Sequence, residues 1–544
     1  MGQVLTLLQP LPARVTRVVS ILTLVAWAGV TGLLVHRSYI KASAANLATD
    51  LARYGSEAQW RGIYYRGEKI GFTVGQVVPT ETGFELQEDG RMQIALLGAD
   101  TVASLRTTAR VDREFALQSF DFSLDPGTGP TRISGIVNGL QLALTVTTPA
   151  GARSETRTLA EPPALALNLG RRLAAAGLKT GARHQIQVFD PATLSNAPMT
   201  IIVRDRELIR LAGLPLPVFR LDMQFAGLNA TSWITDTGEV VREESALGML
   251  VVKEEPDVAP RMAVSGRARA DLIRTAAIVP GMTHRIDDPR TVRRLVLRLT
   301  GAELPAGDLD GAGQRELPRS GNAQVIELRD PRELASGALD PGAARYLAPE
   351  PLLESDAPEV IAEAALAIRG AADPREQAER LVRHVNAILD KKPPISIPSA
   401  KDVLRTKIGD CNEHTALYVA MARAIGIPSR IAVGLVYLNG AFFYHAWPEV
   451  YLRKGSAAQW LPVDPTLNQF PADATHLRVA RGGLDKQVLV LPLIGRLKID
   501  VTEMQLAEGA IPTLIGAAPS PVTVVPLTVT PQRGHQGCGC WRDR

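Results

Sequence analysis

The chain has 544 residues, which is too many for one ordinary hydrophobic core, so we expect two or three domains. Hydrophobic residues make up 46% of the sequence and charged residues 21%, a balance typical of folded globular proteins. The net charge of +4 is small and no basic stripe is interleaved with aromatic residues, so the sequence gives no reason to expect a nucleic-acid partner. The chain has three cysteines, two of them in the last seven residues, and this excludes a disulfide framework.

The N-terminal region contains an uncharged apolar run from Val18 to Val35, which follows two arginines. About 18 such residues are just long enough to cross a bilayer as a helix. A cleaved signal peptide that ends at Ala42–Ala44 is the alternative, but Arg37 and Lys41 lie between the apolar run and that site. The sequence therefore favours a transmembrane anchor in the inner membrane over residues 1–40. The rest of the chain would then lie in the periplasm or another extracytoplasmic space.

Residues 41–290 are expected to form a β-rich antiparallel domain. Short segments rich in β-branched and aromatic residues, such as Thr200–Arg204, are separated by polar turns. Trp233–Arg242 predicts a hairpin, and Ala164–Ala176 predicts one helix. No metal-ligand spacing and no nucleophile motif occurs in this part of the sequence, so the domain is expected to pack, to bind a partner or to act as a spacer.

Two further regions lie on either side of residues 346–505. Residues 291–345 are expected to be a β-containing connecting region, and residues 506–544 a disordered tail rich in proline and glycine. Cys538 and Cys540 lie close together in this tail. Metal capture or surface attachment by these thiols is a weak hypothesis, because an unstructured tail offers few other ligands.

In residues 346–505 the apolar residues first recur with a helical period, and strand-like segments follow. Asp356 with Glu359, Asp373, Ser399, and Asp410 with Glu413 have the spacing of helix N-caps. Strands are expected at 429–437, 441–446, 449–452 and 459–463. Helices followed by an antiparallel sheet indicate an α+β domain. The predicted fold class of the chain is therefore α+β: a transmembrane helix, a β-rich antiparallel domain and then this α+β domain.

Cys411 is the candidate nucleophile. If Asp410 is the N-cap, Cys411 occupies the first helical position, near unpaired backbone N–H groups and the positive end of the helix, and both favour a thiolate. A buried structural cysteine is the alternative. The polar neighbours in Gly409–Glu413 argue against that alternative.

His445 and Asp464 are the candidate partners of this thiol. Strand alternation places Phe443, His445 and Trp447 on one face. Taken alone, His445 is more typical of a core histidine, and Asp464, which precedes Pro465, is also typical of a turn. Together, a cysteine at a helix start, a histidine on the next hairpin and a carboxylate after the following strand indicate a thiol nucleophile with a base and an orienting group.

These segments resemble a known family. Gly409–Cys411, His445–Val450 and Trp460–Thr466 resemble motifs of the bacterial transglutaminase-like superfamily, as does the helix-to-strand connection Ala424–Arg430. The resemblance covers roughly Tyr346–Ile499. It implies a papain-like core with Cys411 as nucleophile, His445 as general base and acid, and Asp464 orienting the imidazole. It also implies a protein or peptide substrate and neither a metal nor another cofactor.

The implied reaction is a two-step acyl transfer. The Cys411 thiolate attacks an amide carbonyl, His445 protonates the departing amine, and the thioester passes to an amine or to water. The backbone N–H of Cys411 is expected in the oxyanion hole, whereas the second donor is not identified.

Three alternatives remain beside this interpretation. One is a cysteine peptidase or amidase of the same fold, and another is a non-catalytic binding scaffold. The third is a zinc site formed by Cys411, His414 and His445, which is disfavoured because it lacks a second close-spaced ligand pair. His414 itself is interpreted as a polar residue of the first helical turn.

Overall fold

The computed structural model describes residues 54–55, 57–96, 99–127, 129–211, 213–225, 227–245, 248–262, 276–334, 336–392, 397–510 and 513–514. The chain divides into two compact units, Met1–Ala58 and Gln59–Arg544, and all elements named below belong to the second. Strands account for 50% of the structure and helices for 18%.

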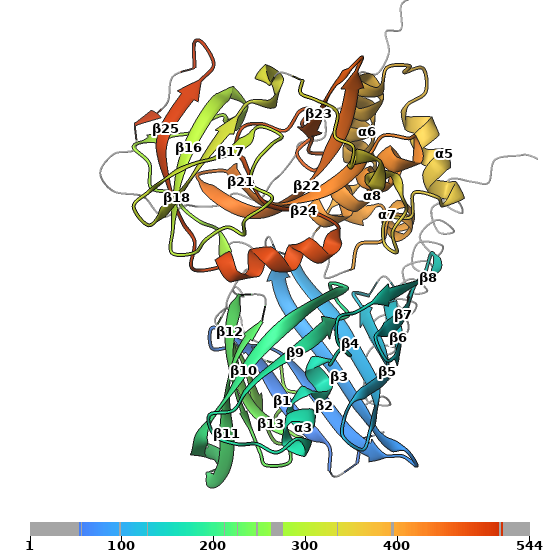
Figure 1. Cartoon of the computed structure of the whole chain (residues 1–544), viewed down its shortest axis with the longest axis vertical. Helices are drawn as coiled ribbons and strands as arrows, with labels where there is room; N and C mark the ends of the chain where they lie inside the picture. The colour runs from blue at the N-terminus through green and yellow to red at the C-terminus, as the bar shows by residue number, and fades with distance from the viewer. Residues whose placement is uncertain are drawn as a thin grey trace, which may run out of the picture. The chain divides into compact units, whose positions relative to one another are not determined.

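The largest element is an antiparallel sheet of 14 strands (Figure 1). Its order is β8-β7-β6-β5-β4-β3-β2-β1-β14-β13-β12-β11-β10-β9. The first and last of these strands in the sequence, β1 and β14, therefore pair with each other near the middle of the sheet. On β7 every second residue (Leu142, Leu144 and Val146) is buried, which is the period-two pattern of a sheet with one face on a core. The strands are β1 (Gln59–Tyr65), β2 (Glu68–Pro79), β3 (Gly83–Leu96), β4 (Ala99–Asp112), β5 (Leu117–Asp125), β6 (Thr131–Asn138), β7 (Gln141–Thr148), β8 (Gly151–Thr158), β9 (Arg183–Asp190), β10 (Ser195–Leu211), β11 (Leu214–Phe225), β12 (Leu228–Ile234), β13 (Val240–Ser245) and β14 (Met249–Lys253).

One helix, α3 (Ala166–Ala175), interrupts these strands. Its buried residues Leu169 and Leu173 belong to the same hydrophobic cluster as Ile201 and Val203 of β10. The predicted helix at Ala164–Ala176 and the predicted hairpin, now β12 and β13, are both present.

A second, four-stranded antiparallel sheet joins distant parts of the chain. Its order is β17-β18-β16-β25, and β25 lies about 170 residues beyond the others in sequence. Its strands are β16 (Val292–Thr300), β17 (Gln314–Ser320), β18 (Ala323–Arg329) and β25 (Lys498–Leu506). The short elements nearby in sequence are β15 (His284–Arg285), β26 (Thr513–Leu514), η2 (Pro289–Thr291), η3 (Pro331–Glu333), η4 (Ala343–Leu347) and η5 (Leu484–Leu493).

Four α-helices follow between residues 358 and 424: α5 (Pro358–Ala367), α6 (Pro374–Ile388), α7 (Ala400–Thr406) and α8 (Cys411–Ala424). Asp373 and Ser399 accept backbone hydrogen bonds as the predicted N-caps of α6 and α7. The capping box predicted for Asp356 and Glu359 is wrong. Ala357 is the N-cap of α5 and makes no side-chain cap, whereas the Asp356 carboxylate binds Arg153 at 2.6 Å.

The last sheet, β23-β22-β21-β24, packs against α8, with strands β21 (Ser429–Leu438), β22 (Ala441–Lys454), β23 (Ala457–Pro462) and β24 (His476–Gly482). β22 is one continuous strand, although two were expected on either side of Pro448. Proline lacks an N–H, but its carbonyl still accepts a hydrogen bond from Val463 N at 2.9 Å. A short parallel pair, β19 (Asp390–Lys391) and β20 (Ile408–Gly409), precedes α8.

The predicted fold class, α+β with an N-terminal transmembrane helix, is wrong. The structure is mostly β, because long hairpins pair into one large antiparallel sheet that outweighs the helices of the last third. Among the described residues no helix is long and apolar enough to cross a membrane. The predicted span Val18–Val35 lies outside the described residues, and the extracytoplasmic location therefore stays a prediction.

Candidate active site

Cys411 is the first residue of α8. Asp410 accepts a hydrogen bond from Asn412 N at 3.0 Å, and Glu413 accepts one from Asp410 N at 2.9 Å, which makes a reciprocal capping box. Gly409 is required just before the cap, because a Cβ there would lie 2.2 Å from Cβ of Glu413. The predicted helix start is confirmed in detail, and it places the Cys411 thiol at the positive end of the helix.

The first turns of α8 are bound to strand β22 at Ala446. The Ala446 carbonyl accepts a hydrogen bond from Thr415 Oγ1 at 3.1 Å, and the Ala446 backbone also hydrogen-bonds Cys411. The residue before Ala446 is His445, so the candidate base and the candidate nucleophile lie on elements that are joined at this point. Burial raises the pKa of the Cys411 thiol well above its usual value, and the Asp410 carboxylate acts in the same direction. The thiol therefore needs a base to ionise near neutral pH.

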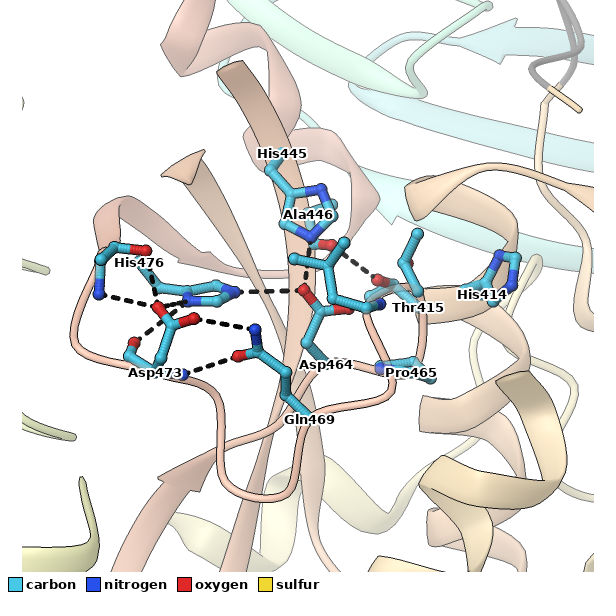
Figure 2. A network of polar contacts seen from close by, with 12 residues as sticks. His414, Thr415, His445, Ala446, Asp464, Pro465, Gln469, Asp473 and His476 are labelled. Carbon is cyan, nitrogen blue, oxygen red and sulfur yellow. Dashed lines mark hydrogen bonds and ion pairs between the residues drawn. The ribbon is translucent and has the colours of Figure 1, made fainter. Parts of the chain in front are cut away.

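His445 and Asp464 form a direct pair (Figure 2). His445 Nε2 lies 2.7 Å from Asp464 Oδ2, while Oδ1 accepts a hydrogen bond from Leu467 N at 2.9 Å. Asp464 is fully buried. Burial raises the pKa of Asp464, but its interactions with His445 and with a second histidine, His476, outweigh burial and hold the pKa well below its usual range. The bond uses Nε2, so Nδ1 is the ring nitrogen that Asp464 does not bind.

A second histidine, which the sequence reasoning missed, shares the same carboxylate. His476, at the start of β24, has Nε2 3.1 Å from Asp464 Oδ2 and Nδ1 3.3 Å from Asp473 Oδ1 (Figure 2). The Trp447 ring packs edge-on against His476, with ring centroids 5.1 Å apart. The only signal in the sequence was an aspartate three residues before a histidine, and neither spacing nor composition connects that pair to Asp464.

Comparison with known proteins assigns part of this region to a family. Residues 362–465 match the transglutaminase-like superfamily. The matched segment contains Cys411, His445 and Asp464 and ends before Asp473 and His476. The catalytic roles of the first three residues stay a prediction.

No curated protein is significantly similar to the chain. Among solved structures, a β-barrel-like protein of domain family DUF1849 from Brucella abortus has a TM-score of 0.29 at 12% identity and covers 36% of this chain and 96% of its own. A putative cysteine protease from Cytophaga hutchinsonii has a TM-score of 0.26 at 16% identity, and the match covers 42% of this chain and 90% of the protease chain. A putative protease from Parabacteroides distasonis has a TM-score of 0.19 at 13% identity, and the match covers 64% of this chain and 68% of the protease chain. These TM-scores are too low to carry an argument about fold or function.

In the described part of the chain, Cys411, His414 and His445, which were considered for a zinc site, do not form a group of close-lying metal ligands. His414 is buried, its Nδ1 lies 2.6 Å from the Asp410 carbonyl, and burial lowers its pKa. Among the described residues, the group of possible metal ligands is instead His445, Asp464 and His476, whose ligand atoms lie within 4.8 Å of one another. The contacts within this group, 2.7 and 3.1 Å to one carboxylate oxygen, are hydrogen bonds in length and direction.

A buried ion-pair network fixes the strands that carry the two histidines. Glu449 on β22 binds Arg430 of β21 and Arg478 of β24, each at 2.7 Å, and all three side chains are almost fully buried. The guanidinium of Arg430 also stacks on Trp460, 3.8 Å from the ring centroid. Three neighbouring strands are thereby held in register behind the site.

Proposed function

We propose that the transglutaminase-like domain is a thiol enzyme in which Cys411 is the nucleophile, His445 the general base and acid, and Asp464 the group that orients the imidazole. The observation that carries this proposal is the 2.7 Å bond between His445 Nε2 and the buried Asp464 carboxylate, next to a cysteine at a helix start. A scaffold gains nothing from a buried carboxylate paired with a histidine at this position, because burying a charge is costly.

The reaction begins with a proton transfer. In the free enzyme the Cys411 thiol is neutral, since burial raises its pKa. His445 Nδ1 removes the thiol proton as sulfur attacks the amide carbonyl, and Asp464 stabilises the imidazolium that forms. The backbone N–H of Cys411, which has no partner within the helix because it is the first helical residue, donates to the developing oxyanion.

The tetrahedral intermediate then collapses to a thioester. His445 gives its proton to the departing amine, which leaves as a neutral molecule. A second nucleophile, water or a primary amine, loses a proton to His445 and attacks the thioester, which releases an acid or a new amide together with the Cys411 thiol. The proposed substrate is an amide of a protein or a peptide, by similarity to the superfamily.

Amine incorporation tests this proposal. The purified chain is incubated with casein as acyl donor and a biotinylated primary amine, and labelling of casein, release of ammonia and cleavage of the casein chain are all followed. We expect at least one of these signals in the wild type. Labelling indicates transfer, whereas ammonia release or cleavage without labelling indicates hydrolysis.

The matched controls are cysteine substitutions. Cys411→Ala is expected to abolish the signal, by on the order of 10⁴-fold or more, whereas Cys538→Ala combined with Cys540→Ala is expected to leave it unchanged. His445→Ala is expected to resemble Cys411→Ala. A signal that survives Cys411→Ala, or no signal in the wild type with a panel of protein donors, contradicts the proposal.

A further inference from the structure

We propose that His476 is held as an imidazolium between Asp464 and Asp473, and that its buried positive charge positions Asp464 and offsets the effect of that carboxylate on the Cys411 thiol. This inference rests on the proposed function only in the role that it gives to Cys411. His476 and Asp473 lie beyond the segment that matches the transglutaminase-like superfamily. Because His476 contacts the Asp464 carboxylate, we describe it as a positioning residue that acts through Asp464.

The first argument is that both ring nitrogens of His476 face oxygen acceptors. Nε2 lies 3.1 Å from Asp464 Oδ2, and Nδ1 lies 3.1 Å from the Asp473 carbonyl oxygen and 3.3 Å from Asp473 Oδ1. A neutral imidazole carries one donor and one acceptor nitrogen. Either neutral tautomer would point a lone pair at an oxygen lone pair, so the arrangement in Figure 2 requires a proton on both nitrogens.

The second argument is that Asp473 is surrounded by donors and is therefore an anion. Its Oδ1 accepts from Thr475 N at 2.9 Å and from Thr475 Oγ1 at 2.6 Å, and its Oδ2 accepts from Gln469 Nε2 at 2.8 Å. Burial raises the pKa of Asp473, but the hydrogen bond and charge of His476 outweigh burial and lower it. Gln469 is held in turn, because its Oε1 accepts from Asp473 N at 2.8 Å.

The result is a row of alternating charges behind His445: Asp464 negative, His476 positive and Asp473 negative. The three residues are 0%, 7% and 6% exposed, so water screens these charges little. Burial lowers the pKa of His476, but its hydrogen bonds with Asp464 and Asp473 outweigh burial and raise the pKa to about 10. His476 thus keeps its charge throughout the physiological pH range.

The arginines near this row are occupied elsewhere. Arg332 interacts with Asp473, but its guanidinium lies 2.6 Å from Asp330. Arg478, on the same strand as His476, is bound by Glu449. Lys391 interacts with Asp464 electrostatically without a hydrogen bond among the described residues. The direct side-chain partners of the Asp464 carboxylate in the described part of the chain are therefore the two histidines.

The charge on His476 offsets the charge of Asp464 at the Cys411 thiol. The Asp464 carboxylate raises the pKa of this thiol, and His476 Nε2 lies 3.1 Å from Asp464 Oδ2. At an effective dielectric of about 20, a unit charge about 10 Å away shifts a pKa by roughly one unit. Removing the charge of His476 leaves the charge of Asp464 less compensated, so the Cys411 thiol becomes harder to ionise and thiolate formation moves to higher pH.

The test uses the alkylation of Cys411, which needs no substrate. Iodoacetamide labelling of the Cys411 peptide in the full chain is measured by mass spectrometry from pH 4.5 to 10, in the wild type and in His476→Gln. Glutamine keeps a donor for Asp464 but not the charge. We expect the midpoint of the rate profile to rise by roughly one pH unit.

Thr475→Val is the matched control. This substitution removes one hydrogen bond to Asp473 and keeps both charges, so its midpoint is expected to match the wild type within about 0.3 pH units. If His476→Gln is folded and its midpoint equals that of Thr475→Val, the proposal is wrong, because a purely structural role predicts that result.

A second measurement covers the case in which His476→Gln does not fold. The wild-type chain is labelled with ¹⁵N-histidine, and its eight imidazole rings are followed by NMR up to pH 9. At least one ring is expected to keep both protons at pH 9, and the proposal is overturned if none does. Neither measurement depends on acyl transfer, so an inactive enzyme with a charged His476 would contradict the proposed function and leave this inference standing.

Discussion

Glu449→Gln is the most demanding test of the structure. Glu449 lies on β22, four residues after His445, and is 0% exposed. Its two carboxylate oxygens bind Arg430 and Arg478 at 2.7 Å, and these side chains are 4% and 3% exposed. Glutamine has nearly the same shape but no charge, so the substitution leaves two buried guanidinium groups without their anion.

The pKa of Glu449 gives the magnitude. Burial raises this pKa, but the charges of Arg478 and Arg430 outweigh burial and lower it from 4.5 to about 2. Such a shift corresponds to about 3 kcal/mol of folding free energy at neutral pH. Because the folded-state pKa is depressed, this stabilisation is present above pH 4.5 and is lost as the pH falls toward 2. We expect Glu449→Gln to cost about 3–5 kcal/mol at pH 7.

Urea unfolding followed by circular dichroism measures this cost. Glu303→Gln is the matched control, because Glu303 also binds an arginine, Arg319, at 2.7 Å but is 66% exposed. The control is expected to leave the stability nearly unchanged, because water screens an exposed ion pair. The reasoning is refuted if Glu449→Gln costs less than about 1 kcal/mol at pH 7. It is also refuted if the wild type loses no more stability than the variant between pH 4.5 and pH 3.

Three further substitutions test the site and its support. Asp464→Asn is expected to lower kcat/KM by on the order of 10³–10⁴-fold in the assay for amine incorporation or hydrolysis, with an unchanged circular dichroism spectrum; activity within tenfold of the wild type would contradict its role. Gly434→Ala on β21 places a Cβ 2.0 Å from the Leu477 carbonyl oxygen, so we expect a loss of about 3 kcal/mol or more in urea unfolding. An unchanged midpoint would show that β21 and β24 lie further apart than described. Tyr418→Phe removes the buried hydrogen bond from the Tyr418 hydroxyl to the Ala378 carbonyl at 3.0 Å, and a cost of about 1–2 kcal/mol is expected in the same assay.

Local chemistry made part of the site predictable. Capping depends on residues two or three positions apart, so Asp410 and Glu413 identified the start of α8 and placed Cys411 at its first position. The same reasoning failed at Asp356. A distant partner, Arg153, takes that carboxylate, and cap spacing contains no information about such a partner.

The second histidine illustrates what spacing does not reveal. His476 follows Asp464 by 12 residues, but it meets the carboxylate only because β24 pairs antiparallel with β21. β21 in turn pairs with β22, which carries His445. The fold class was misjudged for a related reason. Single segments of the first 250 residues, such as the hairpin at Trp233–Arg242, were predictable locally, whereas the pairing of 14 strands into one sheet depends on distant contacts such as β1 with β14.

The sequence by itself determined the helix start at Cys411, the candidate roles of Cys411, His445 and Asp464, and the superfamily that their motifs resemble. These follow from short-range rules of capping, alternation and motif order. Only the tertiary structure decided that Asp464 serves two histidines, that Asp473 supports the second, and that a buried Glu449 holds the strands together. Contacts of this kind join residues whose separation in sequence is set by sheet pairing and burial, and neither is encoded in a local pattern.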